Sequence, residues 1–140
     1  MAKRVLVPID GSEQAWNALD HATAEHSTAA FVLLHVINPV GAGTGAQVAD
    51  VGYGEEWYAA AERRAESLFE TARERVGDRP VETETTVGRP ARAIVAVAEE
   101  NDVDGIVMGS HGRDGVSRVV LGSVAETVVR RSPVPVTVVR

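Results

Sequence analysis

Five short runs rich in valine and isoleucine alternate along the chain with four longer segments of helical pattern. We expect strands over the runs, at residues 5–9, 31–37, 81–87, 103–108 and 134–139. We expect helices over the segments between them, at residues 12–26, 55–76, 90–100 and 123–131. Strands that alternate with helices predict an α/β fold, in which right-handed crossovers build a parallel sheet with helices on both faces.

Several local signals support these bounds. Gly77 follows the second helix, where a glycine commonly ends a helix. Pro90 stands at the first turn of the third helix, and Pro133 follows the fourth. Most of the apolar runs are continuous, as in strands covered by helices on both faces. Residues 81–87 differ, because the run alternates and contains many polar residues, and they therefore predict an edge strand.

The favoured arrangement is a single doubly wound five-stranded parallel sheet in the order 3-2-1-4-5, with the third and fifth strands at its edges. The pattern alone leaves the flavodoxin-like order 2-1-3-4-5 open. In the favoured order the winding reverses between the first and fourth strands, and a crevice opens beyond their carboxyl ends. Residues 10–12 and 109–112 follow those two strands, so we expect the functional chemistry there.

Composition narrows the class of protein. The 140 residues fit one domain, residues 1–140, and cysteine is absent, which excludes disulfides and thiolate metal sites. The net charge of −6 argues against a general nucleic-acid binder. No apolar run approaches a membrane span, and the first ten residues lack the pattern of a signal peptide. We therefore expect a cytoplasmic protein that binds neither nucleic acid nor membranes.

A glycine pattern follows the fourth strand: Gly109, two residues, Gly112, nine residues, then Gly122 and Ser123 at the start of a helix. Glycines let a backbone approach a ligand closely, and amides at a helix N-terminus bind phosphate. Arg113 in the connecting loop offers countercharge. The alternative is a simple turn, followed by a capping box formed by residues 123–126.

These residues resemble a known family. Residues 7–12 read Val-Pro-Ile-Asp-Gly-Ser, and together with the glycine spacing, the element order and the Pro-Val-x-Val ending they resemble the ATP-binding branch of the universal stress protein family, which is UspA-like. The resemblance implies a fold similar to the adenine nucleotide alpha-hydrolases. It also implies ATP or AMP as ligand, with Mg²⁺ or Mn²⁺ on unknown metal ligands, and a homodimer through the edge of residues 134–139.

The resemblance also assigns site residues by position. It implies that Asp10 lies at the adenine and ribose end, above a floor formed by Pro8. Residues implied to pack against or flank the base and ribose are Val36, Met108 and Gly109, and those implied to surround the phosphates are Gly112, Gly122, Ser123 and Val124. From the residues alone, Val36 and Met108 can equally be plain core. Asp10 can equally cap the first helix in a capping box with Glu13.

The function expected from these features is a nucleotide-dependent regulatory module of the stress response. The alternatives are a slow ATP-hydrolysing or adenylating enzyme of the same fold, and a chaperone-like partner that binds no nucleotide. The Ser-Gly-Gly-x-Asp-Ser loop of adenylating enzymes is missing after the first strand, and the sole lysine, Lys3, excludes a P-loop. A G-x-G-x-x-A pattern at residues 41–46 follows no strand directly, so the glycine-rich loop of residues 38–54 is interpreted as a flap beside the nucleotide.

Overall fold

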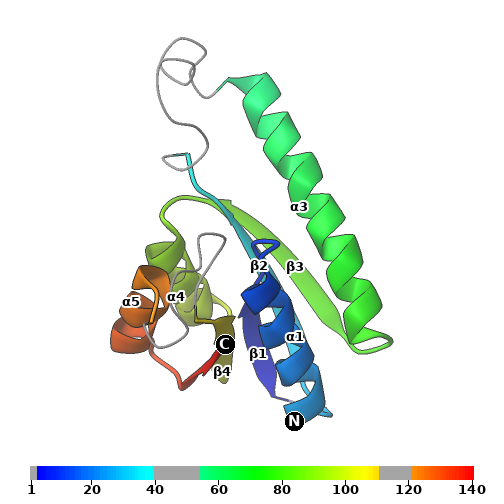
Figure 1. Ribbon diagram of the computed structural model, residues 1–140, viewed down its shortest axis with the longest axis vertical. Coiled ribbons are helices and arrows are strands. Elements are labelled where there is room, and N and C mark those ends of the chain that lie inside the picture. The colour runs from blue at the N-terminus through cyan, green and yellow to red at the C-terminus, as the bar shows by residue number, and fades with distance from the viewer. Residues whose placement is uncertain (1–2, 40–53, 111–120) are drawn as a thin grey trace.

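The computed structural model describes residues 3–39, 54–110 and 121–140, in which strands and helices alternate along the chain (Figure 1). In chain order the elements are β1 (Arg4–Pro8), α1 (Glu13–Glu25), β2 (Ala30–Ile37), α3 (Glu55–Val76), β3 (Val81–Val87), α4 (Pro90–Glu100), β4 (Gly105–Gly109), α5 (Ser123–Arg131) and β5 (Val136–Val139). The bounds of α3, α4, α5 and β3 are those predicted from the sequence, and the other bounds shift by one or two residues.

The five strands form one sheet in the order β3-β2-β1-β4-β5, and every neighbouring pair is parallel. The predicted doubly wound order is therefore confirmed, and the flavodoxin-like order is excluded. The predicted edge positions of β3 and β5 are also confirmed. From β1 the chain winds outward through β2 to β3, and then returns to the other side of β1 through β4 to β5. The winding reverses between β1 and β4, and in open α/β sheets ligands usually bind beyond the carboxyl ends of the strands at such a point.

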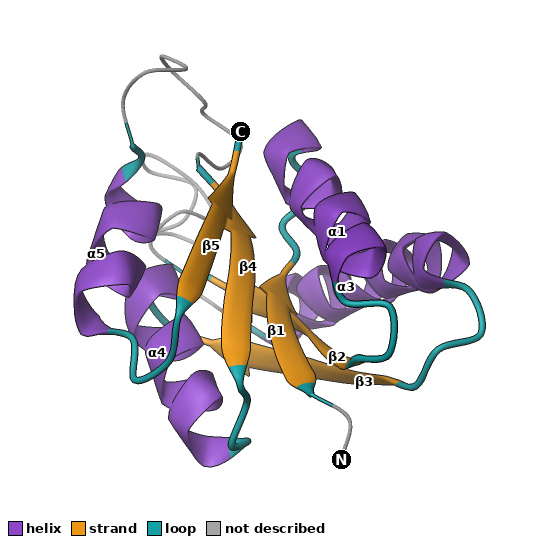
Figure 2. Cartoon of the chain, turned by 90° about the horizontal axis from the view of Figure 1, so that it is seen from below, coloured by secondary structure: helices purple, strands orange, loops and turns teal. Residues whose placement is uncertain are grey.

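Helices cover both faces of this sheet, with α1 and α3 on one side and α4 and α5 on the other (Figure 2). Side chains of a strand alternate between faces, so each strand contributes to both layers of the core. In β1, Val5 and Val7 pack in the layer under α1 and α3, whereas Leu6 packs in the layer under α4 and α5. In β2, Phe31 and Leu33 join the first layer, and Val32 and Leu34 join the second. This two-sided burial explains why the apolar runs are continuous in sequence.

The helix ends follow local chemistry. Ser12 is the N-cap of α1, and its Oγ accepts a hydrogen bond from the amide of Ala15 at 3.1 Å. Gly77 ends α3 with φ 82°, a conformation that favours glycine because it has no Cβ. Pro90 opens α4, where its missing N–H leaves no helical hydrogen bond unmade.

Only the second half of α3 packs on the sheet. Its buried residues are Ala65, Phe69, Ala72 and Val76, and the first turns carry none. The amino-terminal part of the helix consequently extends beyond the carboxyl edge of the strands (Figure 1). There Arg64 and Leu68 lie next to Gly11, since a Cβ added to that glycine would stand 3.4 Å and 3.2 Å from their side chains.

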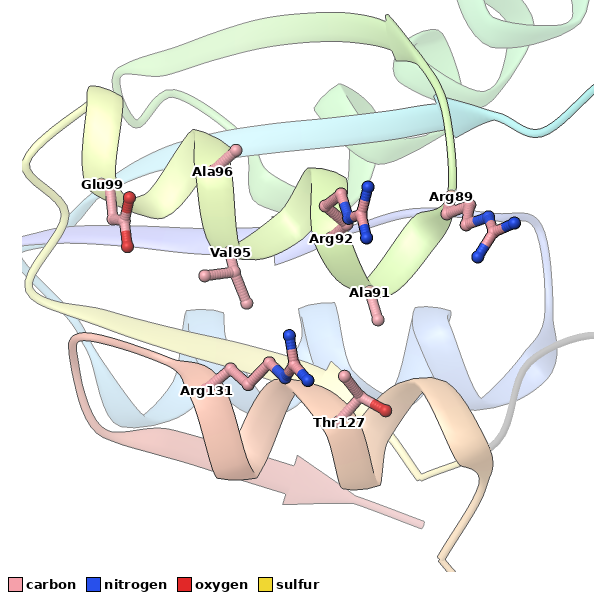
Figure 3. A pocket seen from close by; sticks show the side chains of 8 residues that line it. All are labelled: Arg89, Ala91, Arg92, Val95, Ala96, Glu99, Thr127 and Arg131. Carbon is pink, nitrogen blue, oxygen red and sulfur yellow. The ribbon is translucent and has the colours of Figure 1, made fainter.

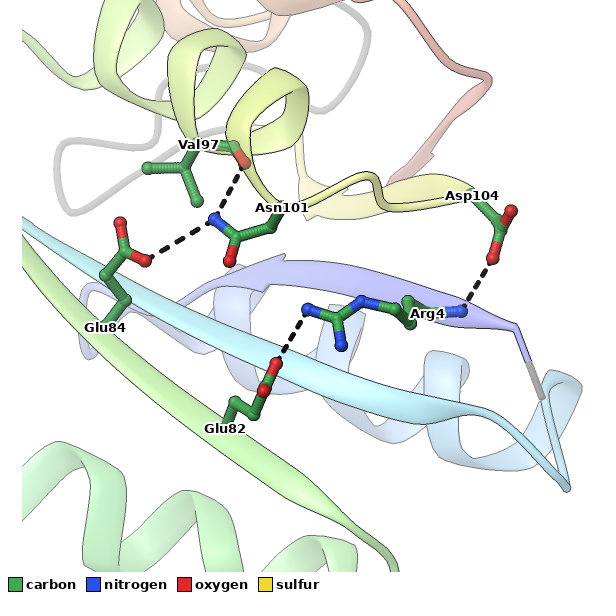
Figure 4. Close-up of polar contacts among 6 residues, drawn as sticks. All are labelled: Arg4, Glu82, Glu84, Val97, Asn101 and Asp104. Atoms are coloured by element: carbon green, nitrogen blue, oxygen red, sulfur yellow. Dashed lines mark hydrogen bonds and ion pairs between the residues drawn. The ribbon is translucent and has the colours of Figure 1, made fainter. Parts of the chain in front are cut away.

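Polar contacts at the opposite, amino edge tie the outer strand to the centre (Figure 4). The Arg4 guanidinium reaches across β2 to the Glu82 carboxylate on β3 at 2.7 Å, while the Arg4 backbone amide donates to Asp104 at 2.8 Å. Asn101 donates to Val97 and to the Glu84 side chain. The Arg4–Glu82 pair is partly solvated, with 35% and 62% of its side chains exposed, so it stabilises the fold by at most about 1 kcal/mol. We interpret these contacts as structural.

Candidate functional site at the carboxyl edge

The ends of β1 and β4 lie side by side at the carboxyl edge, because the two strands are parallel neighbours. Past the end of β1, the Ile9 amide donates to Leu34 on β2 at 2.7 Å. Past the end of β4, the Ser110 amide donates to Val139 on β5 at 2.7 Å. The backbone is thus held in place one residue beyond each strand, where Asp10 and the glycine-rich segment begin.

Asp10 forms a tight turn with the two residues that follow it. Its Oδ1 accepts a hydrogen bond from the Ser12 amide at 2.9 Å, and Gly11 between them has φ 86°. The N-cap of α1 is Ser12, so the interpretation of Asp10 as a capping residue paired with Glu13 is wrong. That bond uses one of the two carboxylate oxygens, and the half-buried Asp10 remains within reach of a ligand at the edge.

The start of α5 is fixed to the end of β4. The Gly122 amide donates to the carbonyl of Ser110 at 2.8 Å, and Gly122 is the N-cap with an extended backbone and no side-chain cap. Ser123 is therefore the first helical residue, and the alternative of a capping box formed by residues 123–126 is wrong because Ser123 is not the cap. Amides of a first helical turn have no acceptor within their helix, and they stand at the positive end of its dipole. An anion can satisfy them.

An apolar wall adjoins this helix start. Val36 and Met108 belong to the core layer under α4 and α5, and Pro8, two residues after Leu6, follows the same alternation. The three residues predicted to line the base thus come from the central strands β1, β2 and β4 and share one face. Met108 is only 5% exposed and serves as core, whereas Pro8 and Val36 are half-buried.

Gly109, the last residue of β4, has a packing role that the sequence did not reveal. A Cβ at this position would lie 2.8 Å from Cβ and 2.9 Å from the carbonyl carbon of Gln14 in the first turn of α1. Real Cβ atoms do not come so close to a backbone. Glycine at 109 therefore lets α1 pass directly over the end of β4.

A pocket of about 320 Å³ lies at this edge, between the carboxyl end of β2 and the starts of α4 and α5. We call it the edge pocket. The residues that line it are Asn38, Arg89, Pro90, Ala91, Ser123, Val124 and Thr127. Ser123 and Val124 were predicted from the sequence, but the α4 residues were not. The sequence did contain a signal for the α4 residues. The turn before α4 follows the parallel strand β3, so it must lie at the same edge of the sheet as the turns that follow β1 and β4. The Gly88 amide fixes that turn to β2 by donating to the carbonyl of Ile37 at 2.9 Å.

Some predicted site residues lie outside the described residues, namely Gly112, Arg113 and the glycine-rich loop from residue 40 to residue 53. Within the described ranges, no three or more His, Cys, Asp or Glu side chains lie together as metal ligands. The described helices also include none that is long and apolar enough to cross a bilayer. His35 is 8% exposed, and its Nδ1 lies 2.7 Å from the carbonyl oxygen of Ile9.

Comparisons with known proteins agree with this architecture. Universal stress protein YxiE of Bacillus subtilis is 32% identical over 148 residues, covering 100% of both chains. Universal stress protein MJ0577 of Methanocaldococcus jannaschii is 34% identical over 157 residues, covering 100% of this chain and 96% of its own. The solved structure of MJ0577 superposes with a TM-score of 0.86, covering 99% of this chain and 96% of that one.

A further solved structure carries a ligand. It is a universal stress protein in complex with cAMP, 28% identical and similar with a TM-score of 0.66, covering 99% of this chain and 97% of that one. The sequence profile of the Universal stress protein family matches residues 1–140. With this match, the shared fold and two full-length relatives above 30% identity, the chain belongs to the universal stress protein family.

Proposed function

We propose that this protein binds an adenine nucleotide, ATP in the first place, at the carboxyl edge of its sheet, and that it acts as a nucleotide-dependent regulatory module of the stress response. The observation that carries the proposal is the start of α5. This helix opens on Gly122 with no side-chain cap, beside a pocket that Ser123 and Val124 line. The complex of a related universal stress protein with cAMP supports an adenine nucleotide as the class of ligand.

The base and ribose would lie over the central strands. Pro8 and Val36 would form an apolar floor, and Met108 would support it from within the core. Asp10 would accept a hydrogen bond from the sugar or the base. Gly109 would border the same space with its backbone. A flat apolar floor with a few placed polar groups is the usual design of a nucleotide pocket.

The phosphates would lie at the start of α5. Backbone amides of Ser123 and Val124, together with the Ser123 hydroxyl, would donate hydrogen bonds to phosphate oxygens. Gly112, Gly122 and Arg113 would complete this end, as the glycine spacing predicts. Among the described residues, no three His, Cys, Asp or Glu side chains lie together as metal ligands. In nucleotide sites Mg²⁺ is held largely by phosphates and water, so any Mg²⁺ or Mn²⁺ would arrive with the nucleotide.

Binding, rather than turnover, is the activity that the residues support. Hydrolysis requires a base that positions water and groups that stabilise the transition state. The edge pocket is lined by no carboxylate and no histidine among the described residues. Asp10 is a carboxylate near the site, but it lies at the predicted base end. A slow ATP-hydrolysing or adenylating activity is the second candidate, and product analysis separates the two.

We further propose that two copies associate through β5, which is an edge strand of the sheet. A cytoplasmic location, predicted from the sequence, is part of the same proposal.

Calorimetric titration of the purified protein with Mg·ATP tests the central proposal. We expect saturable binding of one nucleotide per chain, with ATP recovered intact. Replacement of Gly122 by leucine should reduce ATP affinity at least about tenfold, because the side chain would occupy the approach to the helix amides. Gly122 has φ −67°, so the leucine backbone is unstrained.

The control is Thr28→Leu, which adds the same side chain at the opposite edge of the sheet. Thr28 is an exposed turn residue between α1 and β2. This variant should bind ATP like the parent. Equal affinity of the Gly122→Leu variant and the parent would refute the phosphate assignment. Release of ADP, or of AMP with pyrophosphate, at a rate abolished by a site substitution would favour the enzymatic alternative.

A further inference from the structure

A second and larger pocket, of about 410 Å³, lies between α4 and α5 (Figure 3). We call it the inter-helix pocket; its charged lining is Arg89, Arg92 and Glu99 from α4 and its N-cap, and Arg131 from α5. It shares Arg89, Ala91 and Thr127 with the edge pocket. Because three residues line both, the two pockets adjoin each other, and the inter-helix pocket begins where the edge pocket ends.

The charge of this lining is opposite to that of the whole protein. The lining contains three arginines and one glutamate and is therefore positively charged, whereas the chain as a whole has a net charge of −6. None of the ion pairs within the described residues involves Arg89, Arg92 or Arg131. Arg130, next to Arg131 on α5, differs because its guanidinium pairs with Glu126 at 2.7 Å. Guanidinium groups without a carboxylate partner are available to an anionic ligand.

The arginines are spread along the inter-helix pocket, which adjoins the edge pocket at the start of α5. Thr127 lies one helical turn after Ser123, so both stand on the same side of α5. Arg89 stands at the start of α4, where the two pockets meet, and Arg92 lies about one turn further along. Arg131 extends from the far end of α5 toward α4 (Figure 3), about 12 Å along the helix from Ser123.

We propose that Arg89, assisted by Arg92, binds the terminal phosphates of the nucleotide and so makes the site prefer ATP to AMP. This inference rests on the proposed function, since it assumes that the α-phosphate lies at the start of α5. A monophosphate would end at the α5 amides. The β- and γ-phosphates would reach Arg89, whose planar guanidinium can donate two parallel hydrogen bonds to phosphate oxygens.

The test is the ratio of ATP affinity to AMP affinity, measured by calorimetry at fixed ionic strength for the parent and single variants. Arg89→Ala should weaken ATP binding about tenfold and leave AMP binding within about twofold. Arg92→Ala should have a smaller effect of the same kind. Arg131→Ala, at the far end of the inter-helix pocket, and Arg130→Ala, outside it, should leave the ratio unchanged. Urea unfolding of each variant checks that the fold is retained.

The outcomes separate the two claims. If the parent binds neither ATP nor AMP, the proposed function fails and this inference fails with it. If the parent binds ATP but Arg89→Ala keeps the same ATP-to-AMP ratio, the assignment of Arg89 is overturned while the proposed function stands. An equal loss of ATP affinity in all four variants would also overturn it, because a general effect of positive charge does not depend on position.

Discussion

Glycine at position 109 is required by packing, independently of any ligand. A Cβ there would stand 2.8 Å from Gln14, whereas a Cβ at Gly105, in the same strand, would meet Pro135 at an ordinary 3.5 Å. We therefore expect Gly109→Ala to reduce the free energy of unfolding by about 1–3 kcal/mol, the usual cost of overpacking. Gly105→Ala should change it by less than about 1 kcal/mol. Urea unfolding of both variants is the measurement, and equal midpoints would contradict the close approach of α1 and β4.

The same residue shows where the sequence was ambiguous. The glycine spacing drew Gly109 into the ligand site, but nothing in the sequence says that α1 crosses the end of β4. Met108 was left open between ligand contact and core; its side chain is 5% exposed and packs in the core layer under α4 and α5. Arg89 was missed although the topology places the turn before α4 at the carboxyl edge, and its contribution to the lining of the edge pocket depends on how α4 packs, which local patterns do not encode. Asn38 was predicted only as part of the glycine-rich loop of residues 38–54.

At the scale of elements, two serines at helix starts have different roles. Ser12 caps α1 through its Oγ, whereas Ser123 follows the N-cap of α5 and does not cap that helix. Ser12→Ala should lower the free energy of unfolding by about 1 kcal/mol, as for a lost N-cap. Ser123→Ala should change it by less than about 0.5 kcal/mol, yet weaken ATP binding severalfold.

Thermal or urea unfolding measures the first effect, and calorimetry the second. A Ser123→Ala variant as destabilised as Ser12→Ala would mean that Ser123 stabilises α5 rather than a ligand.

Sequence patterns predicted the elements better than their ends. Helices with clear punctuation, such as the one that begins at Pro90 and the one that ends before Gly77, were predicted to the residue. Strand bounds were less accurate because apolar runs indicate burial rather than pairing. Val103 is buried, with 5% of its surface exposed, but it lies before the start of β4. The residue before it, Asp102, adopts a positive φ of 49°, and the Asp104 carboxylate after it accepts a hydrogen bond from the Arg4 amide. The pairing of β4 with β1 begins only at Gly105.

At the scale of the whole molecule, topology was the most predictable property. Strands and helices alternate regularly along the chain, which leaves few possible sheet topologies. The many polar side chains of β3 and the prolines at the start of β5 further favour edge positions for these two strands. The order of strands then determined which turns meet, and so predicted a site at the ends of β1 and β4. The edge pocket is lined by residues just after β2 and at the starts of α4 and α5. The sequence could not give the shape of the pocket, which depends on the packing of α4 against α5.

The open edge of β5 leads to a prediction about assembly. Pro135 and Val139 accept hydrogen bonds from β4, so Val136 and Val138, which alternate with them, direct their amides to the open edge. If β5 pairs with its copy, Val138→Pro should give a folded monomer, because proline removes an outward donor and leaves the bonds to β4. Val138→Ile is the control and should remain dimeric. Light scattering after size exclusion measures the mass; a dimeric Val138→Pro variant, or a monomeric parent, would contradict dimerisation through this edge.

The central claim is that an adenine nucleotide binds with its phosphates at the start of α5. Two-dimensional amide NMR of the labelled protein, titrated with Mg·ATP, tests it most directly. We expect the largest shifts at Gly122, Ser123 and Val124, with further shifts at Asp10. We expect little change at the amino edge, for example at Glu82 and Asp104, whose contacts lie at the other end of the strands. Shifts centred elsewhere, or none at saturating nucleotide, would contradict it.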